Sequence, residues 1–168
     1  MRLLLFFLVI GALAAETIHL TVEHARTEKE LKWGLMGRKS LPPDHGMLFH
    51  FPKTGRQRVW MFNCLIPLSA AFLDEKGQII EIHQLMAYPD MMKYHHPINS
   101  YEDLNKVSAN DPIVQFFIAE SIVSGPSARY ALEMPLGWFA EKGVNTGDYV
   151  LWDAQYSEAK VLLRKSPN

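Results

Sequence analysis

The chain has 168 residues, of which 48% are hydrophobic and 21% are charged, which fits one globular domain and argues against disorder. Its formal net charge of −1 supplies no basic field for phosphate groups, so nucleic-acid binding is not expected. Ten glycines and ten prolines predict many turns, which favours a strand-rich architecture over a helical bundle.

The first fourteen residues have the pattern of a cleavable signal peptide. Arg2 precedes the apolar run Leu3–Ile10, and Ala12–Ala14 supplies the small residues of a cleavage site. The apolar stretch is shorter than the roughly 20 residues that span a bilayer. We therefore expect a signal peptide over 1–14, one globular domain over 15–168 with no transmembrane segment, and an exported, periplasmic or extracellular location.

The elements that follow begin with a strand and a capped helix. Apolar and polar residues alternate over Ile18–Val22, which predicts a half-buried strand. Thr27 and Glu30 have the spacing of a capping box, which predicts a helix that runs to about Met36 and stops at Gly37.

The middle of the chain predicts several short strands. The segment Asp74–Gly77 is a suitable hairpin connection, with glycine where a positive φ is needed. The predicted strands are Met47–Phe51, Val59–Phe62, Ala70–Leu73 and Gln78–Leu85.

In the last third, Asp111 is a plausible N-cap for a helix that extends to about Val123, because Pro112 takes the first helical position. The further predicted elements are a strand at Arg129–Met134, a short helix between Pro135 and Gly143, a strand at Tyr149–Trp152 and an edge strand at Val161–Leu163. Together these elements predict an α+β, strand-dominated compact domain, barrel-like, with two or three short helices.

Several segments resemble the family called domain of unknown function 192. They are Gly34–Arg38, Gly46–Phe51, Trp60–Leu68, the hairpin Phe72–Ile79, and Tyr130–Glu133 followed by Gly137, Gly143 and Gly147-Asp148. The resemblance covers Ile18–Leu85 and Gly125–Trp152. It implies a compact β-rich domain, an export pathway for many members, and no established activity.

The chain also departs from the pattern of that family. Cys64 stands where threonine is more frequent, and Ser69 stands where aspartate is usual. The family's frequent cysteine after the hairpin is replaced by Ala87–Pro89. The segment Asn99–Ser124 has the appearance of an insertion within the domain.

The segment Trp60–Cys64 is the strongest binding candidate, because Asn63 and Cys64 lie beside aromatic residues. A buried Asn63 would need several hydrogen bonds, which indicates either a fixed network or a ligand; the alternative is a turn cap. Arg38 offers a planar fork to a carboxylate or phosphate ligand, or a structural ion pair with Asp44 or Asp74.

His83 is a more distant candidate. It shares one face of its strand with Glu81, and the two would line a cleft if Glu133 or Asp74 lay across the sheet; the alternative is a solvent-exposed face.

Two alternative functions remain open. Met91, Met92, His95 and His96 place thioether and imidazole groups close together, a combination that suits copper, so a copper-binding protein or chaperone is one alternative. The other is a small hydrolase with Cys64 as nucleophile, which requires a nearby histidine. The sequence favours a non-enzymatic exported binding or accessory module whose ligand or protein partner it does not identify.

Overall fold

The computed structural model describes residues 16–153 and 155–164. Within them lie nine strands: β1 (Thr17–Ala25), β2 (His45–Gly55), β3 (Arg58–Val59), β4 (Leu68–Leu73), β5 (Ile79–Leu85), β6 (Ile122–Val123), β7 (Ala128–Pro135), β8 (Tyr149–Trp152) and β9 (Glu158–Leu162). The helices are α1 (Glu28–Trp33), the 3-10 helix η1 (Met91–Tyr94), α2 (Tyr101–Lys106), α3 (Pro112–Ala119) and α4 (Trp138–Glu141).

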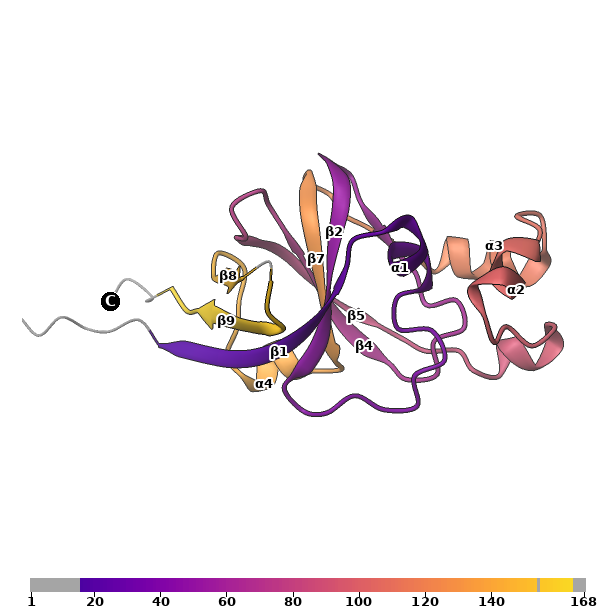
Figure 1. Ribbon diagram of the computed structural model, residues 1–168, viewed down its shortest axis with the longest axis horizontal. Helices are drawn as coiled ribbons and strands as arrows, with labels where there is room; N and C mark the ends of the chain where they lie inside the picture. Colours follow the sequence, from indigo (N-terminus) through magenta and orange to yellow (C-terminus); the bar gives the residue numbers. More distant parts are fainter. Residues whose placement is uncertain (1–15, 154, 165–168) are drawn as a thin grey trace, which may run out of the picture.

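Seven strands form one curled sheet in the order β5-β4-β7-β2-β1-β9-β8 (Figure 1). Only the β1–β2 pair is parallel among these neighbours. The two sheet edges meet where Gln78 forms a bridge with Tyr149 and the amide of Ile79 donates to the carbonyl of Asp148 at 2.8 Å. The sheet therefore curls far enough to bring its edges into contact, and the predicted strand-dominated, barrel-like fold is confirmed.

The curled sheet separates two hydrophobic cores, because side chains alternate between its faces. One core lies inside the curl and includes Leu48, Leu132 and Val161. The other lies on the opposite face and includes Met47, Phe72 and other residues that α1 and the segment after β5 cover. We call these the inner core and the outer core.

The central hairpin agrees with the sequence prediction. The β4 and β5 strands pair antiparallel, and Asp74 accepts hydrogen bonds from the amides of Lys76 and Gln78, both at 2.8 Å. Gly77 has φ 81°, the left-handed conformation that the turn requires.

Other boundaries were predicted wrongly. The first helix ends at Trp33 rather than near Met36, and the third ends at Ala119, since Ile122–Val123 leaves the helix to pair with Arg58–Val59 as a separate two-stranded sheet. The C-terminal strand is not at an edge, because β9 lies between β1 and β8. The short helices η1 and α2 were not predicted.

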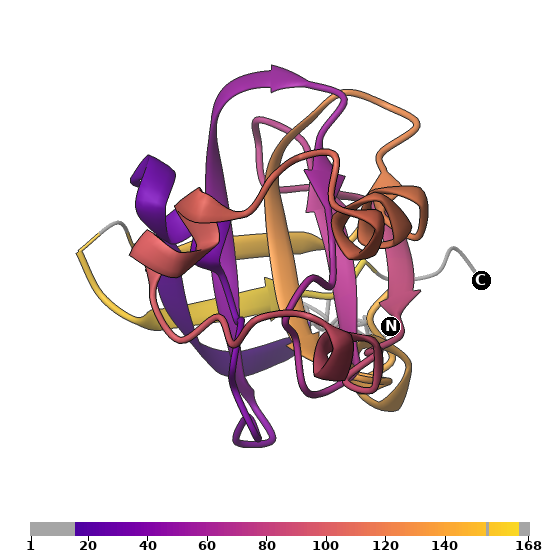
Figure 2. The ribbon, with the colours of Figure 1, turned by 90° about the vertical axis from the view of Figure 1, so that its right-hand side faces the viewer.

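The helices η1, α2 and α3 gather at one end of the molecule, away from the chain ends (Figures 1 and 2). Leu104, Val114 and Phe117 from this segment are buried in the outer core. Phe117 meets Phe62 edge to face, with ring centroids 5.4 Å apart. The segment expected to be an insertion therefore packs onto the same domain as the sheet.

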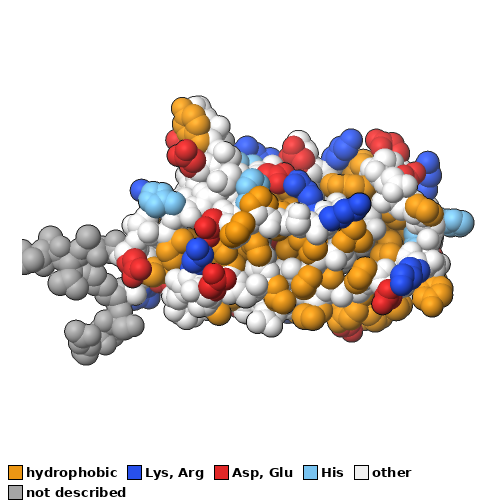
Figure 3. Space-filling model, turned by 90° about the horizontal axis from the view of Figure 1, so that it is seen from below, with side chains coloured by type: hydrophobic (Ala, Val, Ile, Leu, Met, Phe, Trp, Pro, Cys, Tyr) orange, Lys and Arg blue, Asp and Glu red, His pale blue; other side chains and the backbone are white. Residues whose placement is uncertain are grey.

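The surface carries few large exposed hydrophobic side chains within the described ranges. Figure 3 shows hydrophobic and charged side chains interspersed on one face, with more hydrophobic ones in the half away from the chain ends. The most exposed are Met86, Tyr94, Leu136, Leu151 and Tyr156. These residues belong to separate segments, as is normal at a protein surface.

The expected signal peptide over 1–14 lies outside the described residues. In the part of the chain that is described, every helix is too short to cross a bilayer.

Candidate binding site

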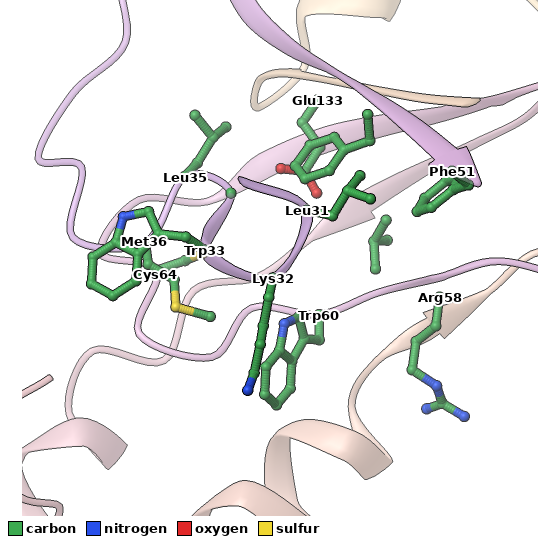
Figure 4. A pocket seen from close by; sticks show the side chains of 13 residues that line it. Leu31, Lys32, Trp33, Leu35, Met36, Phe51, Arg58, Trp60, Cys64 and Glu133 are labelled. Atoms are coloured by element: carbon green, nitrogen blue, oxygen red, sulfur yellow. The ribbon is translucent and has the colours of Figure 1, made fainter. Parts of the chain in front are cut away.

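A cavity of about 80 Å³ lies between α1 and the outer face of the sheet (Figure 4). Its walls come from α1 and the turn after it, from β2, and from the segment that begins at β3; one residue of β7 also lines it. The lining residues are Leu31, Lys32, Trp33, Gly34, Leu35, Met36, Phe49, Phe51, Arg58, Val59, Trp60, Cys64 and Glu133. The pocket thus contains Trp60 and Cys64, two of the residues selected from the sequence.

Local contacts at both ends of α1 determine where the helix begins and ends beside the sheet. The Thr27 hydroxyl accepts from the amide of Glu30, while the Glu30 carboxylate accepts from the amides of Arg26 and Thr27, so the predicted capping box is confirmed. The helix is capped at its C-terminal end by Gly34, which has φ 51° and lies so close to Phe49 that a Cβ would be 3.1 Å from its ring. The backbone conformation and this close approach both require glycine.

Trp60 forms an aromatic wall that is supported from behind. Its ring stacks on Phe62 with centroids 5.1 Å apart and planes 18° apart, and Phe62 is fully buried. Because Phe62 also meets Phe117 edge to face, the helical segment supports Trp60 indirectly. The pocket wall is therefore part of the outer core rather than a free surface loop.

Glu133 is the acidic residue of the pocket. It lies on the central strand β7, paired with Met47 of β2 and Ala70 of β4, and its side chain points to the outer face. Only 5% of the residue is exposed, and its carboxyl makes no hydrogen bond or ion pair within the described residues. Burial alone raises the pKa of Glu133 to about 8, so the group is mostly neutral at pH 7.

Cys64 lies in the same pocket but is 6% exposed. Burial, and secondarily the negative charge of Glu133, raise the pKa of its thiol well above the usual range. No histidine is hydrogen-bonded to Cys64 in the part of the chain described. A nucleophilic thiol needs the opposite environment, so the geometry disfavours the hydrolase alternative.

Comparison with known proteins places this architecture in a family. A sequence model of domain of unknown function 192 (DUF192), described as "Uncharacterized ACR", matches residues 11–152. The chain belongs to the DUF192 family. The resemblance recognised from sequence motifs is thereby confirmed.

Two solved structures are similar to this DUF192 chain. A proposed transcription regulator from Sinorhizobium meliloti 1021 has 26% identity and a TM-score of 0.57, covering 83% of this chain and 95% of the other. A protein of unknown function from Novosphingobium aromaticivorans DSM 12444 has 25% identity and a TM-score of 0.56, covering 78% and 74%. No functionally curated protein matches significantly.

Arg38 and Asn63 do not line the pocket of this DUF192 member. The Arg38 guanidinium donates to Glu23 at 2.6 Å, so its acidic partner is neither Asp44 nor Asp74. The Asn63 side chain donates to the carbonyl of Ile98 at 2.9 Å, and its backbone has φ 54°. Arg38 thus forms a structural ion pair, but with a different acid from the two expected. The Asn63 contact reaches a distant segment, so it fits a fixed hydrogen-bond network and not the local turn cap that was the alternative.

His83 also lies outside the pocket. Its ring nitrogen is 3.3 Å from the Glu81 carboxylate, which in turn accepts from the amide of Gly125. In the strand registers, Ala70 pairs with both His83 and Glu133, so those two side chains are on one face with a strand between them. Glu133 thus lies across the sheet from His83, as considered from the sequence, but His83 is not among the residues that line the pocket.

The four possible copper ligands lie in and just after η1. Met91 and Met92 pack against the outer core, and the rings of His95 and His96 have centroids 6.4 Å apart. The His95 ring contacts the carbonyl of His96 at 2.8 Å and the carboxylate of Asp111 at 3.7 Å. No group of three or more His, Cys, Asp or Glu side chains suited to a metal occurs among the described residues. Copper binding stays a prediction.

Sequence reasoning missed the role of Glu133 in the pocket. The signal was its position between Leu132 and Met134 in a strand whose flanking residues are apolar on both faces. An acid at such a position faces one of two cores whichever way the strand is turned, because side chains alternate.

Proposed function

We propose that this protein is a binding module whose pocket between α1 and the sheet takes a small ligand or one end of a larger one. The observation that carries the proposal is the unpartnered carboxyl of Glu133 at the pocket. A neutral carboxyl can donate one hydrogen bond and accept others, and a carboxylate can accept several. A ligand with a matching polar group supplies the partner that the protein does not.

The free-energy cost of burying the Glu133 carboxyl without a hydrogen-bond partner supports a role in binding. Burying a polar group without a partner costs on the order of 1–3 kcal/mol in proteins, whereas an apolar residue at this position would fill the outer core without that cost. A strongly shifted acid beside a cavity is therefore a candidate functional group.

The arrangement favours binding over catalysis. The pocket offers Cys64 with a raised pKa and no histidine partner among the described residues, so no activated nucleophile accompanies the acid. Aromatic walls with a small number of polar groups are typical of a ligand site.

The test is a titration of small polar compounds followed by the indole N–H signals in NMR spectra. The chain has four tryptophans; Trp33 and Trp60 line the pocket, whereas Trp138 is buried in the inner core and serves as the internal control. We expect at least one class of compound to shift the first two signals selectively. Glu133→Gln should weaken this binding and His83→Ala should not. Shifts of all four signals, or none, would contradict the proposal.

We also propose that the protein acts outside the cytoplasm. The support is the pattern of residues 1–14 described above. Intact-mass measurement of the protein recovered from the periplasm of a Gram-negative host should show the loss of those residues. A full-length mass in the cytoplasmic fraction would contradict export.

A further inference from the structure

We propose that the pocket recognises an alkylammonium group, with the cation held against the Glu133 carboxylate and between aromatic walls. This inference rests on the proposed binding function and specifies the chemistry of its ligand. The group is either a free small amine or ammonium ion, or the side-chain end of a lysine in a peptide.

The first argument is that the acid has no counter-charge of its own. Two basic residues line the pocket, but both are engaged elsewhere: Lys32 donates to the side chain of Asn105 at 2.7 Å, and Arg58 donates to the carbonyl of Ile118 at 3.0 Å. Figure 4 shows the charged ends of both directed away from Glu133. A cationic ligand would therefore bring the first positive charge to this carboxyl.

The second argument is the chemistry of the walls. The pocket is lined by two indoles, Trp33 and Trp60, and two phenyl rings, Phe49 and Phe51. The faces of such rings attract cations, with about 0.5–2 kcal/mol per contact, and tryptophan is the best of them. A neutral hydrocarbon would also fit these walls, but it would leave Glu133 unpartnered.

The third argument is size. A water molecule needs roughly 10–15 Å³ of such a cavity, so a volume of about 80 Å³ holds a group of about five to eight non-hydrogen atoms. A tetramethylammonium ion or the last atoms of a lysine side chain meets that limit. A nucleotide or a sugar is too large to enter completely.

Binding of a cation should be coupled to release of a proton. Burial keeps Glu133 mostly protonated at pH 7, because it raises the pKa to about 8, and the ion pair requires the ionised form. The affinity for a permanent cation should therefore rise by more than about tenfold between pH 6.0 and pH 8.5. Binding of a neutral compound should not show this rise.

The experiment compares tetramethylammonium chloride with tert-butyl alcohol, a neutral compound of the same number of non-hydrogen atoms, by the indole NMR titration at both pH values. At pH 8.5 we expect tetramethylammonium to bind at least about tenfold more tightly than tert-butyl alcohol. We also expect it to bind at least about tenfold more tightly at pH 8.5 than at pH 6.0. Glu133→Gln, which keeps the shape but cannot ionise, should abolish both this preference and the pH dependence. Arms with n-butylammonium and with a blocked lysine peptide, compared with its acetyllysine form, distinguish the free amine from the peptide source.

The outcomes separate the two proposals. Equal affinity for the two probes, or a preference that survives in Glu133→Gln, overturns the cationic ligand while leaving a binding pocket. If no probe shifts the signals of Trp33 or Trp60 at either pH, the cationic ligand fails, and the broader compound screen decides the binding function itself.

Discussion

Glu133 keeps its proton in the folded protein at pH values where an ordinary glutamate is ionised. Its folded-state pKa is about 8, against an ordinary value of 4.5 that the unfolded chain is expected to have. Between these values the unfolded state binds fewer protons than the folded state. The stability contributed by neutral Glu133 is therefore complete below about pH 4.5 and is lost as the pH rises toward 8.

This difference predicts a pH-dependent loss of stability that one substitution removes. From pH 5 to pH 8, the free energy of unfolding should fall by up to about 1.4 kcal/mol per pH unit relative to Glu133→Gln, because the variant does not ionise. Urea unfolding of both proteins across this range measures the effect. Parallel stability curves for the two proteins would show that Glu133 is not held neutral by burial.

The thiol of Cys64 leads to a second prediction at this scale. Because the residue is 6% exposed and burial raises its pKa, labelling by a thiol reagent at pH 8 should be at least about a hundredfold slower in the folded protein than in urea. With an aromatic disulfide as the reagent, the absorbance of the thiolate that the reagent releases follows the reaction. The variant Cys64→Ser gives the background rate. Comparable rates in the two states would restore Cys64 as a candidate nucleophile.

At the scale of elements, the sequence predicted what local patterns determine. Thr27 and Glu30 begin α1, and Asp74 and Gly77 form the hairpin turn, because each contact joins residues within four positions. The end of α3 was predicted wrongly because Ile122–Val123 continues an apolar run, and its strand character depends on pairing with a distant segment.

The candidate site shows the same limit. Trp60 and Cys64 were selected because they are adjacent in sequence to other unusual residues. Their companion Glu133 is far away in the chain and reaches the pocket only through the register of β7 with β2. A single sequence carries no direct record of such pairing, although it showed an acid in an apolar strand.

The capping box of α1 gives a prediction for this element. Thr27→Ala should lower the free energy of unfolding by about 1 kcal/mol, because the amide of Glu30 loses its hydrogen-bond acceptor, the Thr27 hydroxyl. Thr27→Ser keeps the hydroxyl and should stay within about 0.5 kcal/mol of the wild type. Denaturant unfolding compares the three proteins. Equal losses for both variants would mean that the threonine methyl group, not the cap, stabilises α1.

At the scale of the whole molecule, one sheet supports two cores and holds the pocket between the outer core and α1. The strands β2 and β7 lie at its centre, and successive residues of β7 serve different cores: Leu132 and Met134 face inward, whereas Glu133 faces the pocket. The spacing of these two strands therefore affects the packing of the inner core and the position of the pocket acid together.

Gly46 on β2 controls this spacing. A Cβ at this position would lie 2.2 Å from the carbonyl oxygen of Glu133 and 2.3 Å from the sulfur of Met134, so β2 and β7 would have to separate. The methionine side chain can move, but the backbone oxygen is fixed by the strand pairing. The effect of a methyl group should thus spread to both faces of the sheet.

We expect Gly46→Ala to lower the free energy of unfolding by at least about 3 kcal/mol, at the upper end of the cost of overpacking. Gly55→Ala, at the other end of the same strand, is the matched control: the nearest atom to its Cβ would be a side-chain nitrogen of Gln57 at 4.0 Å, so its change should stay within about 1 kcal/mol. Denaturant unfolding of both variants gives the comparison, and the indole N–H signals report whether both cores are disturbed. If Gly46→Ala is as stable as Gly55→Ala, the two central strands tolerate separation and do not fix the position of Glu133.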